Sequence, residues 1–421
     1  MRVCFLVHEL GRSGGAETIR AYARGLEERG FEVDLLPTEP AAGDAGAARH
    51  GEPYDVAIAT WWATAGHLWR VRAERRAVFL QSVESRFYEE RHFFERLAAE
   101  EVLALPVAYV TVAHWIRDLL AELRPDAYCD VVLGGIDKSV FAPRPRPARE
   151  GPLRVLVEGQ PSMWFKGVRE ALAAANAMRE PAEVTVVAGQ PEDAGDLEGA
   201  RVVGGLTASE MADLYAESDV VVKLSRVESL GLGPIEAAHV GTPAVVTPYT
   251  GHDEHIVHGL NGLVVGMDDV PATARALDRL AGDLELRRRL SEGAVDTAGR
   301  WPSAADAVDA FAAALRRIVE RPAPDPGPAL AALALARRRS LELTREHVRQ
   351  SEAELQHAEG MRDWFRHAYD EACEHVEELG AAMRDLDALL RDKDRLIEDI
   401  RSERAYRAAV AVRRVILRRD A

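Results

Sequence analysis

The pattern that most constrains the fold is an alternation of short β-branched runs with helical stretches, which occurs twice along the chain. Such alternation is typical of βαβ units on a parallel sheet. The stretch A-P-R-P-R-P-A-R-E-G-P at residues 142–152 separates the two occurrences, because four prolines in eleven residues cannot continue a helix or a central strand. We therefore predict an α/β chain with two Rossmann-like, doubly wound domains.

The strands of both domains can be placed from these runs. In the first domain we expect strands at Val3–Val7, Val33–Leu36, Asp55–Thr60, Ala77–Leu80, Val107–Val112 and Tyr128–Leu133. In the second domain we expect them at Leu153–Glu158, Val184–Ala188, Asp219–Leu224, Ala244–Thr247 and Leu263–Val265. Further along, the pattern is mainly helical until a second proline-rich stretch, R-P-A-P-D-P-G-P at residues 321–328.

Beyond this second stretch the sequence is rich in Glu, Arg, Ala and Leu, and an apolar repeat of alternating three- and four-residue steps runs through it. A 3.5-residue repeat kept over many heptads favours a supercoiled helix that associates with another copy or a partner helix. The alternative is a helix that packs along its own globular domains. The repeat runs through Leu341, Thr344, Val348, Ser351, Leu355, Ala358, Arg362, Phe365, Tyr369, Ala372, Val376, Leu379, Met383, Leu386, Leu390, Lys393, Ile397 and Ile400.

The C-terminal segment combines six arginines with scattered apolar residues. A basic amphipathic helix suits an anionic membrane surface, although arginines that end a coiled coil and pair with acidic neighbours give the same pattern. The predicted division of the chain is a first domain at 1–143, a linker at 144–152, a second domain at 153–320, a proline-rich linker at 321–328, a coiled coil at 329–403 and a basic tail at 404–421.

Composition narrows the possible partners and compartment. The net charge of −16 would repel a phosphodiester backbone, so nucleic acid is not an expected partner. Three cysteines without a C-x-x-C pair fit a reducing compartment. Residues 1–10 are typical of a short strand rather than a signal peptide, and the longest apolar run, Val102–Ala113, is too short to cross a bilayer. We expect a cytoplasmic protein, with peripheral membrane contact through the basic tail.

Three loops at predicted strand ends carry residues suited to an anionic ligand. Gly14 and Gly15 precede the first helix, where adjacent glycines allow a close backbone approach. Lys166 lies at a helix start after the first strand of the second domain, where its charge can meet a diphosphate. Glu228 follows the strand Asp219–Leu224, and Glu236 lies in the first turn of the next helix, so both carboxylates can face one ligand.

Together these motifs resemble the family 4 retaining glycosyltransferases of the GT-B fold. The resemblance covers about residues 1–320 and rests on the E-x7-E motif of Glu228 and Glu236 with its following G-T-P, on G-G-A-E at residues 14–17, on Lys166-Gly167, and on G-I-D at residues 135–137. It implies a nucleoside-diphosphate sugar as donor, a glycan or lipid-linked acceptor, and no cofactor or metal.

The resemblance also implies roles for single residues. Glu236 would bind the donor ribose and Glu228 the hydroxyls of the donor sugar, while amides near Leu230 and Gly231 would touch the transferred sugar. Lys166 would neutralise the diphosphate, over a floor shaped by Gly14 and Gly15, and Leu206 would lie beside the base. These positions, with His114, Gln160 and Arg226, form the predicted site.

The sequence departs from the family at one charged position. The family usually has an arginine directly after the glycine that ends the second domain's first strand, and here Gln160 stands there. Phosphate charge would then rest on Lys166 alone or on another arginine such as Arg226. In the first domain, Q-S-V-E-S-R-F-Y at residues 81–88 resembles the Q-x-x-E-x-x-F-Y stretch of rhamnosyltransferases that build bacterial surface polysaccharides.

The resemblance implies front-face transfer with retained anomeric configuration, and no obvious nucleophile lies beside the predicted donor site. His252, His255 and His258 lack a recognisable ligand spacing, so no metal site is expected. His114 can help to position the acceptor, or it can serve only as a helix start. The predicted function is a retaining glycosyltransferase of surface polysaccharide assembly. The alternatives are a sugar-nucleotide epimerase or phosphorylase on the same fold, and a carbohydrate-binding or inactive coiled-coil scaffold.

Overall fold

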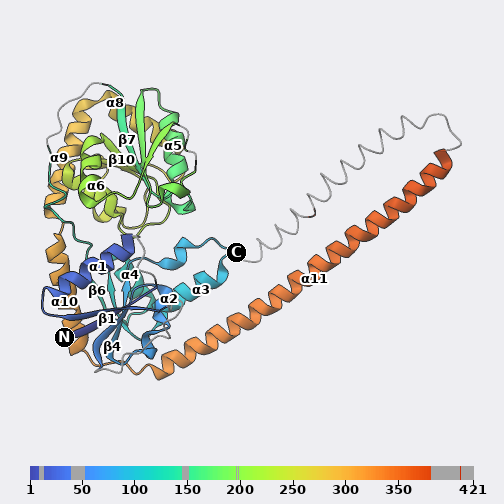
Figure 1. Ribbon diagram of the computed structural model, residues 1–421, viewed down its shortest axis with the longest axis horizontal. Helices are drawn as coiled ribbons and strands as arrows, with labels where there is room; N and C mark the ends of the chain where they lie inside the picture. The colour runs from blue at the N-terminus through green and yellow to red at the C-terminus, as the bar shows by residue number, and fades with distance from the viewer. Residues whose placement is uncertain are drawn as a thin grey trace. The chain divides into compact units, whose positions relative to one another are not determined.

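The computed structural model describes residues 1–8, 14–38, 53–144, 151–195, 197, 199–380 and 408. It divides into two compact units, Met1–Leu330 and Ala331–Ala421. The first unit contains two parallel sheets with helices packed against them, as Figure 1 shows.

The first sheet has six parallel strands in the order β2-β1-β3-β4-β5-β6. Its central strands read as apolar runs because helices cover both faces, as is usual for parallel sheets. The strands are β1 (Arg2–Val7), β2 (Glu32–Pro37), β3 (Tyr54–Ala59), β4 (Ala73–Leu80), β5 (Ala108–Thr111) and β6 (Cys129–Val131). The helices between them are α1 (Gly14–Glu27), α2 (Trp62–Ala65), α3 (Phe93–Glu101) and α4 (His114–Leu123).

The second sheet is also parallel and has the order β12-β11-β10-β7-β8-β9. The order reverses beside β7 and β10, and ligands bind at such a switch point in open α/β sheets. The strands are β7 (Leu153–Glu158), β8 (Ala182–Val187), β9 (Ala200–Val203), β10 (Val220–Lys223), β11 (Ala244–Val246) and β12 (Gly262–Val264). The helices are α5 (Val168–Asn176), α6 (Ala208–Glu217), α7 (Leu232–Val240), α8 (Val270–Gly282) and α9 (Leu284–Arg300).

The two sheets confirm the predicted fold class, and all eleven predicted strands are present with ends that differ by a few residues. β9 was not predicted, because its four residues, A-R-V-V, include a charge and follow a stretch without a strand pattern. None of the helices in the described part of the chain combines the length and apolarity that crossing a bilayer requires.

The helix α10 (Ala304–Glu320) lies on the first sheet rather than on the second. Its Phe311 ring lies 4.6 Å from the Tyr22 ring and 5.2 Å from the Phe79 ring, centroid to centroid, in the core of the first domain. The prediction that placed residues up to 320 in the second domain therefore differs from the packing of this helix. The apolar face of α10 matches the first core, and no local sequence signal specifies which core a helix will join.

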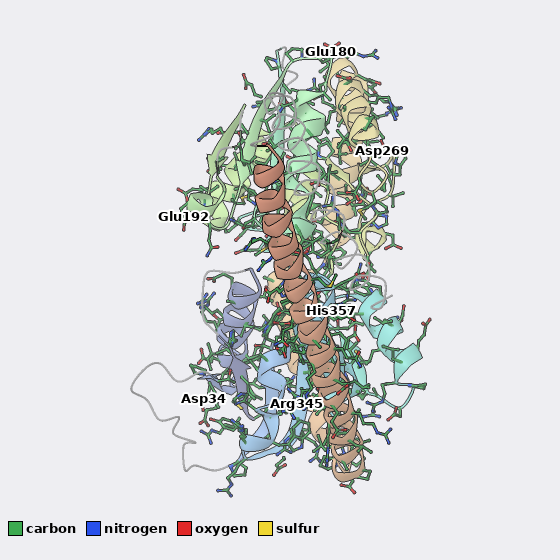
Figure 2. The ribbon with its side chains drawn as sticks, turned by 90° about the vertical axis from the view of Figure 1, so that its right-hand side faces the viewer. Asp34, Glu180, Glu192, Asp269, Arg345 and His357 are labelled. Atoms are coloured by element: carbon green, nitrogen blue, oxygen red, sulfur yellow. The ribbon has the colours of Figure 1, made fainter. Side chains whose placement is uncertain are left out.

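The long helix α11 (Gly327–Gly380) carries most of its apolar side chains in exposed positions. Leu341, Val348 and Leu355 of the predicted heptad repeat are among them, at seven-residue intervals. Figure 2 shows Arg345 and His357 on the same helix, and both are exposed as well. The rest of the predicted coiled coil, 381–403, and the basic tail, apart from Ala408, lie outside the described residues.

Candidate functional site

Two charged side chains end neighbouring strands of the second sheet. Glu158 is the last residue of β7 and Lys223 the last of β10, and both strands are otherwise almost entirely apolar. The Lys223 Nζ lies 3.0 Å from the Glu158 Oε1 and 3.2 Å from the Glu228 Oε1. The Lys223 side chain is only 4% exposed, so this ammonium is buried between two carboxylates.

Glu228 is the centre of the charged cluster. Its Oε1 accepts hydrogen bonds from the Lys166 Nζ at 2.7 Å and from the Ser225 hydroxyl at 3.1 Å, in addition to the contact with Lys223. Burial alone would raise the pKa of Glu228, but the charges of Lys223 and Lys166 outweigh burial and lower the pKa to about 2. Two residues of the predicted site, Lys166 and Glu228, are thus brought together as an ion pair, with Glu228 ionised at neutral pH.

The backbone at Gly167 explains how Lys166 reaches this place. Lys166 ends a short 3-10 turn at Trp164–Lys166, and Gly167 then adopts a left-handed conformation with φ of 65° before α5 begins. A Cβ at Gly167 would lie 2.0 Å from the Leu224 carbonyl oxygen, at the end of β10. Only glycine allows this close approach, which sets the lysine beside the loop that carries Glu228.

The start of α7 is shaped by two more glycines. Gly231 has φ of 73°, and a Cβ there would lie 2.4 Å from the Tyr249 hydroxyl oxygen. A Cβ at Gly233 would lie 1.5 Å from the Glu158 Oε2, so the first turn of α7 sits directly against that carboxylate. The N–H groups of a helix start favour anionic oxygens, and the approach of a ligand to the backbone at Gly231 stays a prediction.

Two carbonyl groups of the loop from Glu228 to Gly231 accept hydrogen bonds from side chains of other segments. The His255 ring nitrogen Nε2 lies 2.6 Å from the Leu230 carbonyl oxygen, and the Trp115 indole donates to the Ser229 carbonyl oxygen at 2.6 Å. Burial lowers the pKa of His255 to about 4, so the ring is neutral and its Nε2–H can donate to this oxygen. His255 therefore holds the Glu228–Gly231 loop in place through the Leu230 carbonyl group.

Glu236 lies in α7, behind the other carboxylates. Its Oε2 accepts a hydrogen bond from the buried Tyr215 hydroxyl at 3.3 Å. Burial and, secondly, the charge of Glu158 raise the pKa of Glu236 to about 8. The two glutamates of the E-x7-E motif therefore carry opposite protonation states at neutral pH, with Glu228 ionised and Glu236 protonated.

Three predicted residues do not join this cluster. Arg226 forms ion pairs with Glu170, at 2.8 Å, and with Asp268, so its guanidinium is already engaged by carboxylates. The Gln160 amide is buried and holds the Gln190 backbone at both ends, with N···O distances of 3.1 and 3.0 Å. Leu206 lies in the exposed loop after β9.

The first domain contributes a second group of predicted residues. Gly14 and Gly15 begin α1, and a Cβ at Gly15 would lie 3.4 Å from the Gln81 side-chain oxygen. His114 begins α4, and its Nδ1 lies 2.9 Å from the Glu254 Oε2 of the second domain. Glu254 also accepts the backbone N–H of His114, so this histidine makes a contact between domains at a helix start.

The segment of residues 81–88 also contacts the second domain. The Phe87 ring stacks on the Phe165 ring at 5.2 Å, centroid to centroid, next to Lys166. Arg86 donates to the Thr250 hydroxyl at 2.7 Å. Glu84 is buried and accepts the Trp62 backbone N–H at 2.6 Å, and burial raises its pKa to about 8. This segment therefore links the first domain to two parts of the second, the turn that carries Lys166 and the loop after β11.

Sequence reasoning missed Glu158, Lys223 and Tyr215. The available signal was the single charge at the end of each of two apolar strands, L-R-V-L-V-E and V-V-V-K. Among the residues that the structure describes, no group of three or more histidine, cysteine or acidic side chains could hold a metal ion. The absence of a metal from the reaction stays a prediction.

Comparison with known proteins identifies the second domain. Residues 149–296 match the family described as glycosyl transferases group 1. This part of the chain is therefore similar to the group 1 glycosyltransferases. The match contains Lys166, Lys223, Glu228 and Glu236, and it confirms the resemblance to the family 4 glycosyltransferases that the motifs indicated.

Characterised relatives are similar over part of their length. The glycogen synthase of Mycobacterium tuberculosis is 28% identical over 232 residues, which are 51% of this chain and 56% of the relative. The D-inositol 3-phosphate glycosyltransferase of Stackebrandtia nassauensis is 34% identical over 120 residues, 28% of this chain and 27% of the relative. The chain thus spans about half, or less, of the length of these relatives.

Solved structures share the fold. The sucrose-phosphate synthase of Thermosynechococcus elongatus superimposes with a TM-score of 0.63 at 17% identity and covers 75% of this chain and 98% of its own. The HepE protein of Anabaena, in complex with UDP and glucose, gives 0.60 at 15% identity, with 75% and 100% covered. These similarities confirm the two-domain GT-B architecture.

Proposed function

We propose that this chain is a retaining glycosyltransferase that transfers a sugar from a nucleoside-diphosphate sugar to a glycan or lipid-linked acceptor. The observation that carries the proposal is the Lys166–Glu228 ion pair of 2.7 Å at the carboxyl end of β10, next to the glycine-shaped start of α7. A cation for the diphosphate and an ionised carboxylate for the sugar hydroxyls then lie side by side. The group 1 glycosyltransferase match over these residues supports the same proposal.

In this mechanism Lys166 and the N–H groups at the start of α7 stabilise the negative charge that develops on the leaving diphosphate. Glu228 accepts hydrogen bonds from the donor sugar, and Glu236 hydrogen-bonds the ribose. The attacking hydroxyl comes from the same face as the leaving group, so the anomeric configuration is retained. His114 and Gln81 face the acceptor from the first domain.

The donor is the first property to test. We would measure the melting temperature of the purified chain with UDP-, GDP-, dTDP- and CDP-sugars, for the wild type and for Glu236→Gln. A ligand at 100 times its dissociation constant should stabilise the folded state by about 2.7 kcal/mol. A shift with one nucleotide sugar that is lost in the variant supports the site, whereas no shift with any of them contradicts the proposal.

Residues 81–88 bear on the donor sugar and on the setting. The resemblance of residues 81–88 to rhamnosyltransferases supports dTDP-rhamnose as the donor to try first, and surface polysaccharide assembly on the inner face of the membrane as the setting. In the melting experiment the variant Glu183→Gln, which removes an exposed carboxylate from β8, serves as the control for Glu236→Gln. NMR of the product then reports whether the anomeric configuration is retained.

The C-terminal part of the chain supports a proposal of its own. We propose that α11 associates with a second copy, because the side chains of Leu341, Val348 and Leu355 are exposed at heptad spacing. The basic tail would add contact with anionic lipid. Both proposals concern assembly and location, and neither is needed for the chemistry of the donor site.

A further inference from the structure

Lysine is rare in this chain, and half of its lysines lie in one cluster. Among 53 basic residues only Lys138, Lys166, Lys223 and Lys393 are lysines. Lys166 and Lys223 both contact the same oxygen of Glu228, at 2.7 and 3.2 Å. An ammonium group is compact and donates in three directions, so one buried lysine can contact two carboxylates from neighbouring segments.

The two lysines differ in their access to a ligand. The Lys166 side chain is 21% exposed, whereas the Lys223 side chain is 4% exposed and is held by Glu158 as well. Lys166 can therefore turn toward a diphosphate, and Lys223 cannot. When Lys166 turns away, Glu228 loses one of its two cations, and a buried carboxylate without a cation is strongly destabilised.

We propose that Lys223 is a positioning residue that keeps Glu228 ionised and oriented while Lys166 binds the donor diphosphate, and that Glu158 holds Lys223 in place. The inference rests on the proposed function, because it takes the diphosphate as the ligand of Lys166. It explains the buried ion pair of Glu158 and Lys223, which links the ends of β7 and β10. Gln160, which stands where the family usually has an arginine, brings no charge, and its amide is hydrogen-bonded to the Gln190 backbone.

Charged and polar groups from several neighbouring elements face Glu228. Lys166 comes from the turn before α5, Lys223 and Ser225 from the end of β10, and Tyr249 from the loop after β11. The acidic Glu158 and Glu236 lie behind Lys223. The described residues place no third cation within 4 Å of Glu228, so without Lys223 the carboxylate would take up a proton when Lys166 turns to the donor.

The test compares two variants that differ only at Lys223. Glu158→Gln keeps the lysine, and Glu158→Gln with Lys223→Met removes it without leaving Glu158 as an unpaired charge. Titration calorimetry with UDP-glucose, or with the GDP-, dTDP- or CDP-sugar that stabilises the wild type most, is run in buffers of different ionisation enthalpy. The heats then give the number of protons taken up on binding, and Glu236, whose pKa Lys223 also lowers, contributes to the difference only where its own protonation changes on binding.

We expect proton uptake in the double variant to exceed that in Glu158→Gln by up to one proton at about pH 6.5. Binding that takes up a proton weakens as the pH rises. The affinity of the double variant, relative to that of Glu158→Gln, should therefore fall by up to tenfold for each unit by which the pH is raised. If the double variant does not fold, Lys223→Gln replaces it, because its amide can still donate to both carboxylates, and the same excess over wild type is expected. Lys138→Met, which changes a half-buried lysine that donates to the Gly299 carbonyl oxygen, should match the wild type.

Equal proton uptake with and without Lys223, in variants that bind the nucleotide sugar, would overturn this role of Lys223 and leave the proposed function standing. A wild type that binds none of the four nucleotide sugars overturns the proposed function and this inference together. The two failures are therefore told apart by the wild-type titration alone.

Discussion

Replacing Glu236 by glutamine should make the free protein more stable than the wild type as the pH rises. The Glu236 carboxyl is held against Tyr215 and repelled by Glu158, and its pKa is raised to about 8. In the unfolded chain the same carboxyl loses its proton near its ordinary pKa of 4.5. Between these two values the folded state holds one more proton than the unfolded state, so the free energy of unfolding falls as the pH rises.

The size of the effect follows from the difference between the two pKa values. Each pH unit in this window removes about 1.4 kcal/mol of stability, up to about 5 kcal/mol in total. From pH 6 to pH 8 the wild type should lose about 2.3 kcal/mol relative to Glu236→Gln, because the folded carboxyl already begins to lose its proton near pH 8; this corresponds to roughly 5 °C in melting temperature at ~2 °C per kcal/mol. The glutamine oxygen can still accept the Tyr215 hydroxyl, so the difference should come from titration alone.

The assay is thermal melting of both proteins without ligand at half-unit steps from pH 6 to pH 8. Because all other titrating groups are shared, only the difference between the two curves is used. The reasoning would be refuted if the melting temperatures of the two proteins changed in parallel with pH. It would also be refuted if the wild type became more stable relative to the variant as the pH rises. The control Glu183→Gln removes an exposed carboxylate and should give a curve parallel to that of the wild type.

Three further outcomes are expected. Gly135→Ala should lower the melting temperature by several degrees, because its Cβ would lie 2.3 Å from the Ser303 carbonyl oxygen under α10, while Gly282→Ala, with open space around it, should not. A chain that ends at Leu330 should keep the melting temperature of the first unit and form smaller oligomers in light scattering; an unchanged oligomer number would contradict association through α11. Treatment with EDTA should leave the rate of sugar transfer unchanged, and a loss that Mg²⁺ or Mn²⁺ restores would contradict the metal-free mechanism.

Much of the fold was predictable because the signals are local. Each core strand is a short apolar run between turn residues, and eleven of the twelve strands were placed from such runs. Glu228 and Lys166 were also predictable as neighbours, since both follow parallel strands whose carboxyl ends meet at one edge of the sheet. The β9 strand was missed because four residues at a sheet edge carry too little pattern.

The hydrogen-bond and ion-pair partners of Gln160 and Arg226 could not be predicted in the same way. Gln160 stands where an arginine was expected, yet its buried amide holds the Gln190 backbone, and Arg226 is paired with Glu170 and Asp268. Which partner a polar side chain takes depends on atoms that are 30 to 56 residues away in the chain. The sequence specifies such a side chain but not its neighbours.

The sequence by itself determined the two parallel α/β domains, the long C-terminal helix and the glutamates of the E-x7-E motif, because hydrophobic period and glycine-rich turns act over a few residues. Only the tertiary structure decided that α10 completes the first core and that Lys223, between Glu158 and Glu228, is a buried charge. It also decided that Glu228 is ionised while Glu236 keeps its proton. Burial and charge proximity set these states, and both arise only when distant strands and helices pack together.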